Sequence, residues 1–166
     1  LRIKMAAPLA KKRSVLFVCL GNICRSTMAE AILLHLIKEK GETDKWVIDS
    51  AAVADYNIGL PPNSRAISTL KKNGITGYTH TARLLTPEDY NKFDIIFGMD
   101  DENMMDMGEM KPKGKCRAQL QMLGDWDPQK ERIIVDPYFS NGTKAFDVVY
   151  DQCVRCLTAL VNAPDG

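Results

Sequence analysis

The chain has 166 residues, of which 45% are hydrophobic and 26% charged, which is the composition of one globular domain and excludes a disordered or fibrous protein. Lysine and arginine number 22 against 21 for aspartate and glutamate, and this net charge of +1 gives no overall field to attract nucleic acid or an anionic membrane. No apolar run approaches the roughly 20 residues that span a bilayer, so we expect no membrane helix.

Buried strands alternate with amphipathic helices along the chain. Residues 14–19 (SVLFVC) form a continuous apolar, β-branched run that is typical of a strand buried on both faces. Residues 26–40 carry apolar side chains at spacings of three and four, which predict a helix. The same patterns predict, in order, a strand at 46–50, a helix at 63–73, a strand at 93–99, a helix at 101–110, a weaker strand at 118–123 and a helix at 144–161. This alternation predicts an α/β fold in which helices cover both faces of a parallel sheet.

In such sheets, ligands bind beyond the carboxyl ends of the strands. The first predicted strand ends at Cys19 and continues through the loop Leu20-Gly21-Asn22-Ile23-Cys24 into Arg25, Ser26 and the first predicted helix. A tight connection of this kind points backbone N–H groups and the positive end of a helix dipole at one place, which makes an anion-binding cradle. Gly21 and Asn22 suit the loop because both tolerate a left-handed backbone.

Three side chains around this cradle fit nucleophilic attack on a phosphate. The field that binds an anion also stabilises a thiolate, so Cys19 is a candidate nucleophile. Arg25 offers a planar fork that matches two phosphate oxygens, and Ser26 can donate a hydrogen bond to the thiolate as it leaves. Taken alone, a cysteine in a strand is more often a small buried hydrophobic residue. The combination Cys-x5-Arg-Ser at a strand-to-helix junction favours the catalytic interpretation.

The segment Val18-Cys19-Leu20-Gly21-Asn22-Ile23-Cys24-Arg25-Ser26, with Asp136-Pro137-Tyr138 far downstream, resembles the low-molecular-weight protein tyrosine phosphatases. The resemblance runs from about Ser14 to Leu160 and includes four more motifs: Asp49-Ser50-Ala51-Ala52, Pro61-Pro62, His80-Thr81-Ala82-Arg83 and Met99-Asp100. It implies a three-layer αβα fold of the flavodoxin-like, phosphotyrosine phosphatase I type with four parallel strands. It also implies hydrolysis of phosphotyrosine proteins and small aryl phosphates without a metal or other cofactor.

The resemblance assigns a cysteinyl-phosphate intermediate to Cys19. It assigns phosphate binding to Arg25 and to the loop residues Leu20, Gly21, Asn22, Ile23, Cys24 and Ser26. Asp136 would be the general acid and then the base, which the chemistry needs because a leaving phenolate must be protonated. Asp136 lies in residues 133–143, the longest stretch without periodicity, and without the resemblance it would be interpreted as a turn residue before Pro137.

The resemblance also names residues around the cradle. Ser26, Ser50 and His80 would hold Asn22 in its strained conformation, although His80 by itself is equally a satisfied structural histidine. Tyr56 and Tyr138 match the aromatic walls that grip a phosphoaryl ring, and either could instead be ordinary packing.

The five cysteines are an odd number at low density, which favours reduced thiols in a cytoplasmic protein over a secreted disulfide framework. Cys24 could capture an oxidised Cys19 as a reversible disulfide, a role that the resemblance supports. Cys153 and Cys156 have the spacing of a zinc or redox pair, but they lie in the last predicted helix without a second ligand pair, so we expect that both pack in the core.

Met5 resembles a natural start. We therefore expect an N-terminal extension over residues 1–13, of which 1–4 precede that start, and one domain over 14–166.

Two departures from the family bear on specificity. Tyr138-Phe139 stands where many animal members carry two consecutive tyrosines, so one regulatory phosphorylation site is missing. Ile23 stands where arginine phosphatases of the family tend to carry threonine, and this difference favours phosphotyrosine over phosphoarginine as the substrate.

We expect the protein to be a monomer. The alternative function is a catalytically silent phosphotyrosine-binding module, which would gain little from having both a nucleophile and an acid.

Overall fold

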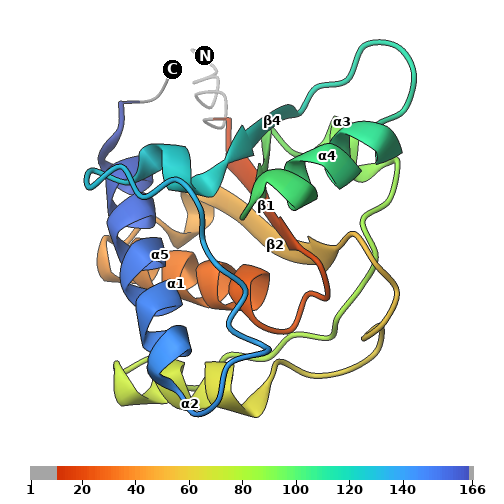
Figure 1. Ribbon diagram of the computed structural model, residues 1–166. Helices are drawn as coiled ribbons and strands as arrows, with labels where there is room; N and C mark the ends of the chain where they lie inside the picture. Colours follow the sequence, from red (N-terminus) through yellow and green to blue (C-terminus); the bar gives the residue numbers. More distant parts are fainter. Residues whose placement is uncertain (1–10, 165–166) are drawn as a thin grey trace, which may run out of the picture.

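A parallel sheet of four strands lies at the centre of the protein, which we describe over residues 11–164 from a computed structural model (Figure 1). The strands are β1 (Arg13–Cys19), β2 (Trp46–Ala52), β3 (Ile95–Gly98) and β4 (Gln119–Met122), and their order in the sheet is β2-β1-β3-β4. All three pairings are parallel, and Val15 of β1 lies between Ile48 of β2 and Ile95 of β3. The expected α/β fold with four parallel strands is confirmed.

The helices cover both faces of the sheet, as Figure 1 shows. On one face lie α1 (Arg25–Glu39), α2 (Ser64–Lys72) and α5 (Lys144–Asn162), and on the other lie α3 (Asp89–Lys92) and α4 (Asp101–Met110). Successive residues of a strand point to opposite faces. Accordingly, Phe17 and Cys19 enter the core under α1 and α5, whereas Leu16 and Val18 enter the second core beside α3 and α4. The unbroken apolar run of β1 therefore requires cover on both faces.

The predicted elements are observed with small changes at their ends. The strand predicted at 46–50 extends to Ala52, and the one predicted at 93–99 is limited to Ile95–Gly98. The prediction missed α3 and two 3-10 turns, η1 (Thr43–Lys45) and η2 (Leu123–Trp126). Each of these has three or four residues, which is too short for an apolar periodicity to show.

The long segment between η2 and α5 has no helix or strand, as predicted for residues 133–143. A Cβ at Gly124 would overlap the Arg132 carbonyl oxygen, so the chain packs closely where this segment begins. Arg155 of α5 donates from Nε and Nη2 to the two carboxylate oxygens of Asp127, each at 2.9 Å. Further along, the Ile134 N–H donates to the Met99 carbonyl at 3.0 Å. These contacts carry the segment back across the carboxyl ends of β1 and β3.

The expected N-terminal extension lies largely outside the described residues, and Arg13 already belongs to β1. Within residues 11–164, none of the helices combines the length and the apolar character that crossing a bilayer requires.

Candidate active site

The loop from Cys19 to Arg25 lies at the carboxyl end of β1, in the middle of the sheet (Figure 1). Asn22 has a left-handed backbone with φ of 56° and is fully buried. The N-cap of α1 is Cys24, whose side chain makes no capping hydrogen bond. The N–H groups at the start of a helix bind anions readily, so this end of α1 is suited to a phosphate.

The Asn22 side chain uses both of its polar atoms to hold this loop. Its Nδ2 donates to Ser26 Oγ and to Ser50 Oγ, each at 2.9 Å. Its Oδ1 lies 2.8 Å from His80 Nε2 and accepts a hydrogen bond from the Arg83 N–H at 3.1 Å. The structure thus brings Ser26, Ser50 and His80 onto Asn22, where the resemblance placed them. These bonds offset a left-handed strain of about 1–3 kcal/mol.

The Cys19 sulfur lies at the floor of a cleft beside this loop and is only 3% exposed. Its Sγ is hydrogen-bonded to Ser26 Oγ at 3.0 Å. Because Ser26 also accepts from Asn22, one hydroxyl group connects the candidate nucleophile to the residue that shapes the loop.

Arg25 lies across the same floor and is 2% exposed. Its Nη1 donates to Asp100 Oδ2 at 2.6 Å and to the Ile134 carbonyl at 2.9 Å, and its Nη2 lies 3.7 Å from Asp136 Oδ2. Burial alone would lower the pKa of Arg25, but the neighbouring Cys19, Asp100 and Asp136 raise it. The guanidinium therefore stays charged, and Asp100 fixes its orientation.

Asp100, which the resemblance included in the Met99-Asp100 motif without a role, lies at the site in the structure. Its Oδ1 accepts the Asn103 N–H at 2.7 Å as the N-cap of α4, while Oδ2 binds Arg25. The signal in the sequence is its place two residues after the end of β3, at the same sheet edge as Cys19.

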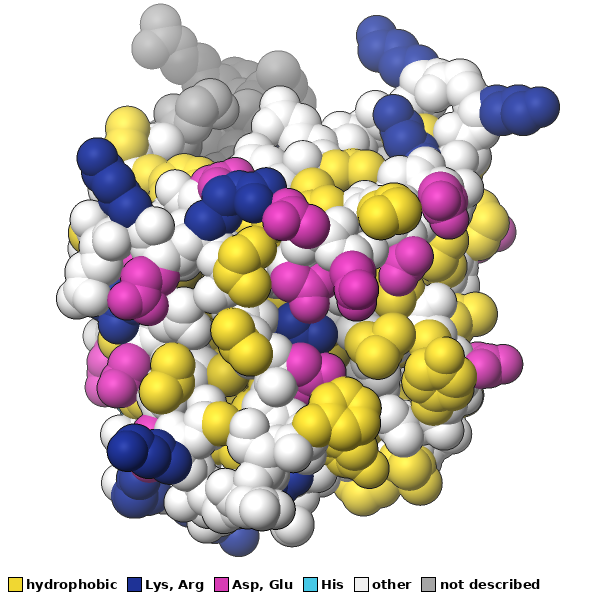
Figure 2. All heavy atoms as spheres, viewed as in Figure 1, with side chains coloured by type: hydrophobic (Ala, Val, Ile, Leu, Met, Phe, Trp, Pro, Cys, Tyr) yellow, Lys and Arg dark blue, Asp and Glu magenta, His cyan; other side chains and the backbone are white. Residues whose placement is uncertain are grey.

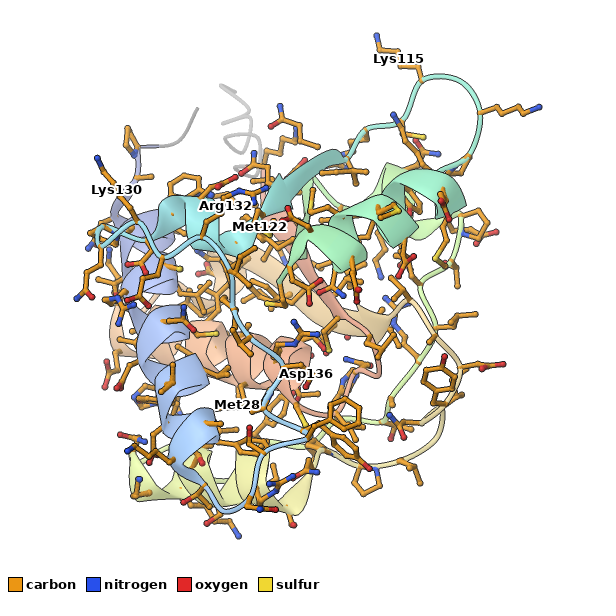
Figure 3. All side chains as sticks on the ribbon, in the orientation of Figure 1. Met28, Lys115, Met122, Lys130, Arg132 and Asp136 are labelled. Carbon is orange, nitrogen blue, oxygen red and sulfur yellow. The ribbon has the colours of Figure 1, made fainter. Side chains whose placement is uncertain are left out.

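Asp136 points into the cleft from the long segment between η2 and α5 (Figure 3). One carboxylate oxygen accepts the Tyr138 N–H at 3.1 Å, and the other faces Arg25. Its side chain is 27% exposed, so it can meet both a substrate and water. Asp136 therefore acts both as a turn residue, through its bond to the Tyr138 N–H, and as a carboxylate of the cleft.

Exposed aromatic side chains form the rim of the cleft, which has a volume of about 180 Å³. Tyr56, Tyr138 and Phe139 are 74%, 47% and 82% exposed, and the last two rings meet edge to face with centroids 5.1 Å apart. Hydrophobic side chains are exposed on the face of the molecule that carries Asp136 (Figures 2 and 3). The remaining lining residues come from the loop and its neighbour: Leu20, Gly21, Ile23, Cys24 and Asn57. The Arg25 guanidinium at the floor can bind a phosphate group, and the aromatic side chains of the rim can contact an aryl ring, so the cleft suits an aryl phosphate.

Among residues 11–164, one group of side chains has the donors to hold a metal ion, and it lies behind the loop. Ligand atoms of Glu30, Asp49 and His80 are within 4.8 Å of one another. Arg83 supplies positive charge there, with its Nε donating to Asp49 Oδ2 at 3.0 Å and its Nη atoms binding Asp89 at 2.9 and 3.0 Å. These carboxylates are therefore partnered within the protein, and none of the group lines the cleft.

Glu30 is a residue that sequence reasoning missed. It lies in α1, is 6% exposed, and its Oε1 accepts a hydrogen bond of 2.6 Å from Ser50 Oγ. Burial raises the pKa of Glu30 to about 7. The signal in the sequence is a glutamate within the most apolar stretch of the chain.

The other cysteines differ from Cys19 in their surroundings. Cys24 lines the cleft, and burial raises its pKa to about 12. Cys153 and Cys156 lie on the buried side of α5 within the core, and burial raises the pKa of each thiol. The prediction that this pair packs in the core is confirmed.

Fold and site together define an α/β protein with a buried thiol at an anion-binding loop. A family model for the low molecular weight phosphotyrosine protein phosphatases matches residues 14–163, and the chain belongs to this family. A relative of that name from Sus scrofa is 49% identical, with 90% of this chain and 94% of the relative covered. The expected family membership is confirmed.

Two solved structures resemble the fold closely. The crystal structure of Primo-1 is 42% identical with a TM-score of 0.84, covering 90% of this chain and 96% of the other. The crystal structure of a Drosophila arginine phosphatase is 35% identical with a TM-score of 0.84, covering 91% and 99%.

Proposed function

We propose that this protein is a protein tyrosine phosphatase that hydrolyses phosphotyrosine and small aryl phosphates through a cysteinyl-phosphate intermediate. The observation that carries the proposal is the meeting of Cys19, Arg25 and Asp136 in one cleft with an aromatic rim. The three residues come from the end of β1, the start of α1 and the segment before α5. Relatives named phosphotyrosine protein phosphatases over nearly their whole length support the same activity.

In the first step, the Cys19 thiolate attacks the phosphorus atom as the bond to the phenol oxygen breaks. Arg25 and the N–H groups of the loop bind the three phosphoryl oxygens, where charge is spread in the transition state. Asp136 donates its proton to the leaving phenol oxygen. The products of this step are the free phenol and a phosphorylated Cys19.

In the second step, a water molecule attacks the cysteinyl phosphate and gives its proton to Asp136. The S–P bond breaks, inorganic phosphate leaves, and Ser26, 3.0 Å from the sulfur, stabilises the returning thiolate. Every group that moves a proton or forms a bond is a side chain or water, so the cycle needs no metal or cofactor.

A second candidate substrate is phosphoarginine, because one structural neighbour is an arginine phosphatase. Ile23, which lines the cleft, is apolar and offers no hydrogen bond to a guanidino nitrogen. The exposed tyrosines Tyr56 and Tyr138 add flat apolar surface for a ring. Both features favour an aryl ester.

The decisive experiment measures phosphate release from p-nitrophenyl phosphate, from a phosphotyrosine peptide and from phosphoarginine, each with and without EDTA. We expect turnover of the two aryl esters, little of phosphoarginine, and no effect of EDTA. A protein that binds the phosphotyrosine peptide but releases no phosphate would instead be the silent binding module.

We also propose that Cys24 protects Cys19 against oxidation, in a monomer that works in the reducing cytoplasm. Both thiols line one cleft, so a sulfenic acid that forms on Cys19 would lie on the same cleft wall as the Cys24 thiol. Attack by the Cys24 sulfur then releases water and leaves a disulfide. Brief peroxide treatment should inactivate the protein reversibly, with a mass loss of two hydrogens on a peptide containing both cysteines. If Cys24→Ser recovers with thiol as fully as the parent, the protective role is wrong.

A further inference from the structure

The segment between η2 and α5 has no helix or strand of its own, so its backbone N–H and C=O groups depend on other parts of the protein for hydrogen bonds. Ile134 is fully buried in this segment, and both of its main-chain groups are bonded. Its N–H donates to the Met99 carbonyl at 3.0 Å, and its carbonyl accepts from Arg25 Nη1 at 2.9 Å. The carbonyl of the preceding residue, Ile133, accepts from Gln152 Nε2 at 3.0 Å. A side chain of α5 therefore binds the segment directly beside the residue that contacts Arg25.

Gln152 lies on the buried side of α5, between Val149 and Cys156, and is 4% exposed. Only one orientation of its amide group fits the surroundings. The Ile133 carbonyl can only accept, and an ionised Glu131 carboxylate, whose Oε2 lies 3.3 Å from Nε2, can only accept as well. The NH2 end of the amide must therefore face the segment.

The other end of the same amide is unfavourable for folding. Gln152 Oε1 is buried and has no hydrogen-bond partner within residues 11–164. A buried acceptor without a partner lowers stability, whereas an apolar side chain of similar shape does not. We therefore expect the folded state to be at least as stable with an apolar side chain here. What the glutamine supplies is its bond to the Ile133 carbonyl.

This bond lies one residue away from the floor of the cleft. Peptide units are planar, so the direction of the Ile133 carbonyl limits the direction of the next carbonyl, on Ile134. The Ile134 carbonyl and Asp100 together orient the Arg25 guanidinium. Asp136 follows two residues later, with its Oδ2 3.7 Å from Arg25 Nη2. A shift of Ile133 would thus displace both the phosphate-binding group and the general acid.

We propose that Gln152 is a positioning residue for the reaction: through its bond to the Ile133 carbonyl it holds the segment before α5 against Arg25. Asp136 is held in the same way, because it belongs to that segment. The proposal rests on the phosphatase function above, since its effect is measured in catalysis. Gln152 itself does not line the cleft and touches no substrate.

The test is Gln152→Met, which keeps the length of the side chain and removes both the donor and the unpartnered acceptor. We expect kcat on a phosphotyrosine peptide to fall about fivefold to thirtyfold, with KM changed less than about twofold, because a misplaced arginine and acid lose transition-state contacts first. The midpoint of urea unfolding should stay at the wild-type value or rise. A kcat within twofold of wild type overturns the proposal.

Gln152→Lys separates the hydrogen-bond donor from the rest of the side chain. A lysine amine only donates, so it can bond to the Ile133 carbonyl and to Glu131 and leaves no acceptor without a partner. We expect kcat to be within about threefold of wild type. If the folded lysine variant loses as much activity as Gln152→Met, then the bond to Ile133 does not position the site and the proposal is wrong.

Tyr90→Phe is the control for the loss of a buried hydrogen bond elsewhere. The Tyr90 hydroxyl donates to the Met107 carbonyl at 2.6 Å in the second core, beside α3 and α4, whereas Ile134 lies in the first core. This variant should lower the midpoint of urea unfolding and keep the wild-type kcat. A loss of kcat as large as that in Gln152→Met would show that the effect is not specific to the segment, which also overturns the proposal.

Hydrogen exchange keeps this proposal distinct from the proposed function. Because the Ile134 N–H is bonded to the Met99 carbonyl, its exchange rate, measured by NMR, reports how firmly the segment is held. We expect exchange about tenfold faster in Gln152→Met than in the wild type. If the wild-type protein hydrolyses no aryl phosphate, the function is wrong, and faster exchange in the variant still supports the positioning. An unchanged exchange rate overturns it.

Discussion

The floor and the rim of the cleft are built in opposite ways. The floor consists of side chains that are at most 3% exposed and joined by short hydrogen bonds: Cys19, Asn22, Arg25 and Ser26. The rim consists of aromatic side chains that are 47% to 82% exposed: Tyr56, Tyr138 and Phe139. Contacts within the protein hold the floor, whereas the rim presents its rings largely to solvent.

This contrast separates catalysis from recognition. Preorganised donors stabilise the transition state without reorganisation, so the floor should set kcat for every substrate that reaches it. Exposed rings contribute apolar contact that depends on the shape of each substrate, so the rim should act mainly on KM. Substitutions in the floor should therefore lower kcat strongly, whereas substitutions in the rim should change KM and have smaller effects.

The largest effect is expected at the nucleophile. Cys19→Ser should lower kcat on the order of 10⁵-fold or more, because a serine hydroxyl is not ionised by the loop. Binding of inorganic phosphate, measured by calorimetry, should change little because Arg25 and the loop N–H groups remain. Activity within tenfold of wild type would remove Cys19 from the role of nucleophile.

Arg25→Lys tests whether catalysis needs the planar guanidinium group of Arg25 or only its positive charge. We expect kcat to fall about 10³-fold to 10⁵-fold, because a lysine offers a point charge and loses the paired contact with Asp100 and Ile134. Arg65→Lys is the control, since Arg65 also donates to backbone carbonyls of the segment before α5 but lies outside the cleft lining. A mild loss in Arg25→Lys would mean that the loop N–H groups alone bind the transition state.

The floor was also the part of the site that the sequence predicted best. Residues 19–26 are contiguous, and a buried strand followed at once by a helix leaves the connecting loop little freedom, so local sequence defines its geometry. Glu30 also supports the floor and lies close to it along the chain, whereas Asp100 is 75 residues from its partner Arg25 and the Arg83 N–H is 61 residues from Asn22. The contacts of Asp100 and Arg83 depend on how β3 and β2 pack beside β1; the place of Asp100 after β3 indicates the sheet edge but not its partner Arg25.

The fold was predictable for a similar reason. Long amphipathic helices and the apolar β1 each bury enough surface to leave a periodic pattern, whereas α3, η1 and η2 are single turns held by their surroundings. The segment of Asp136 was predicted as a loop, but its path depends on the Arg155 pair with Asp127, which is a tertiary contact.

Asp136 belongs to neither region completely, since it faces Arg25 and stands at the base of the rim. Asp136→Ala should lower kcat about 10²-fold to 10⁴-fold on phosphotyrosine, because the tyrosine phenolate needs a proton as it leaves. The loss should be smaller on p-nitrophenyl phosphate, whose leaving anion is already stable. Equal losses on both esters would make Asp136 a positioning residue and require another acid.

The smallest effect is expected at the rim. Tyr138→Ala should raise KM for a phosphotyrosine peptide about threefold to tenfold and leave kcat on p-nitrophenyl phosphate within about twofold, because one exposed ring supplies only part of the apolar contact. Alanine keeps the backbone N–H that donates to Asp136, so the acid stays in place and the substitution tests the ring alone. Val148→Ala removes a similarly exposed hydrophobic side chain, 51% exposed on α5 and outside the cleft lining, and should change neither parameter. If Tyr138→Ala instead lowers kcat tenfold on both substrates with KM unchanged, then the ring orders the Asp136 segment, and floor and rim are one cooperative unit.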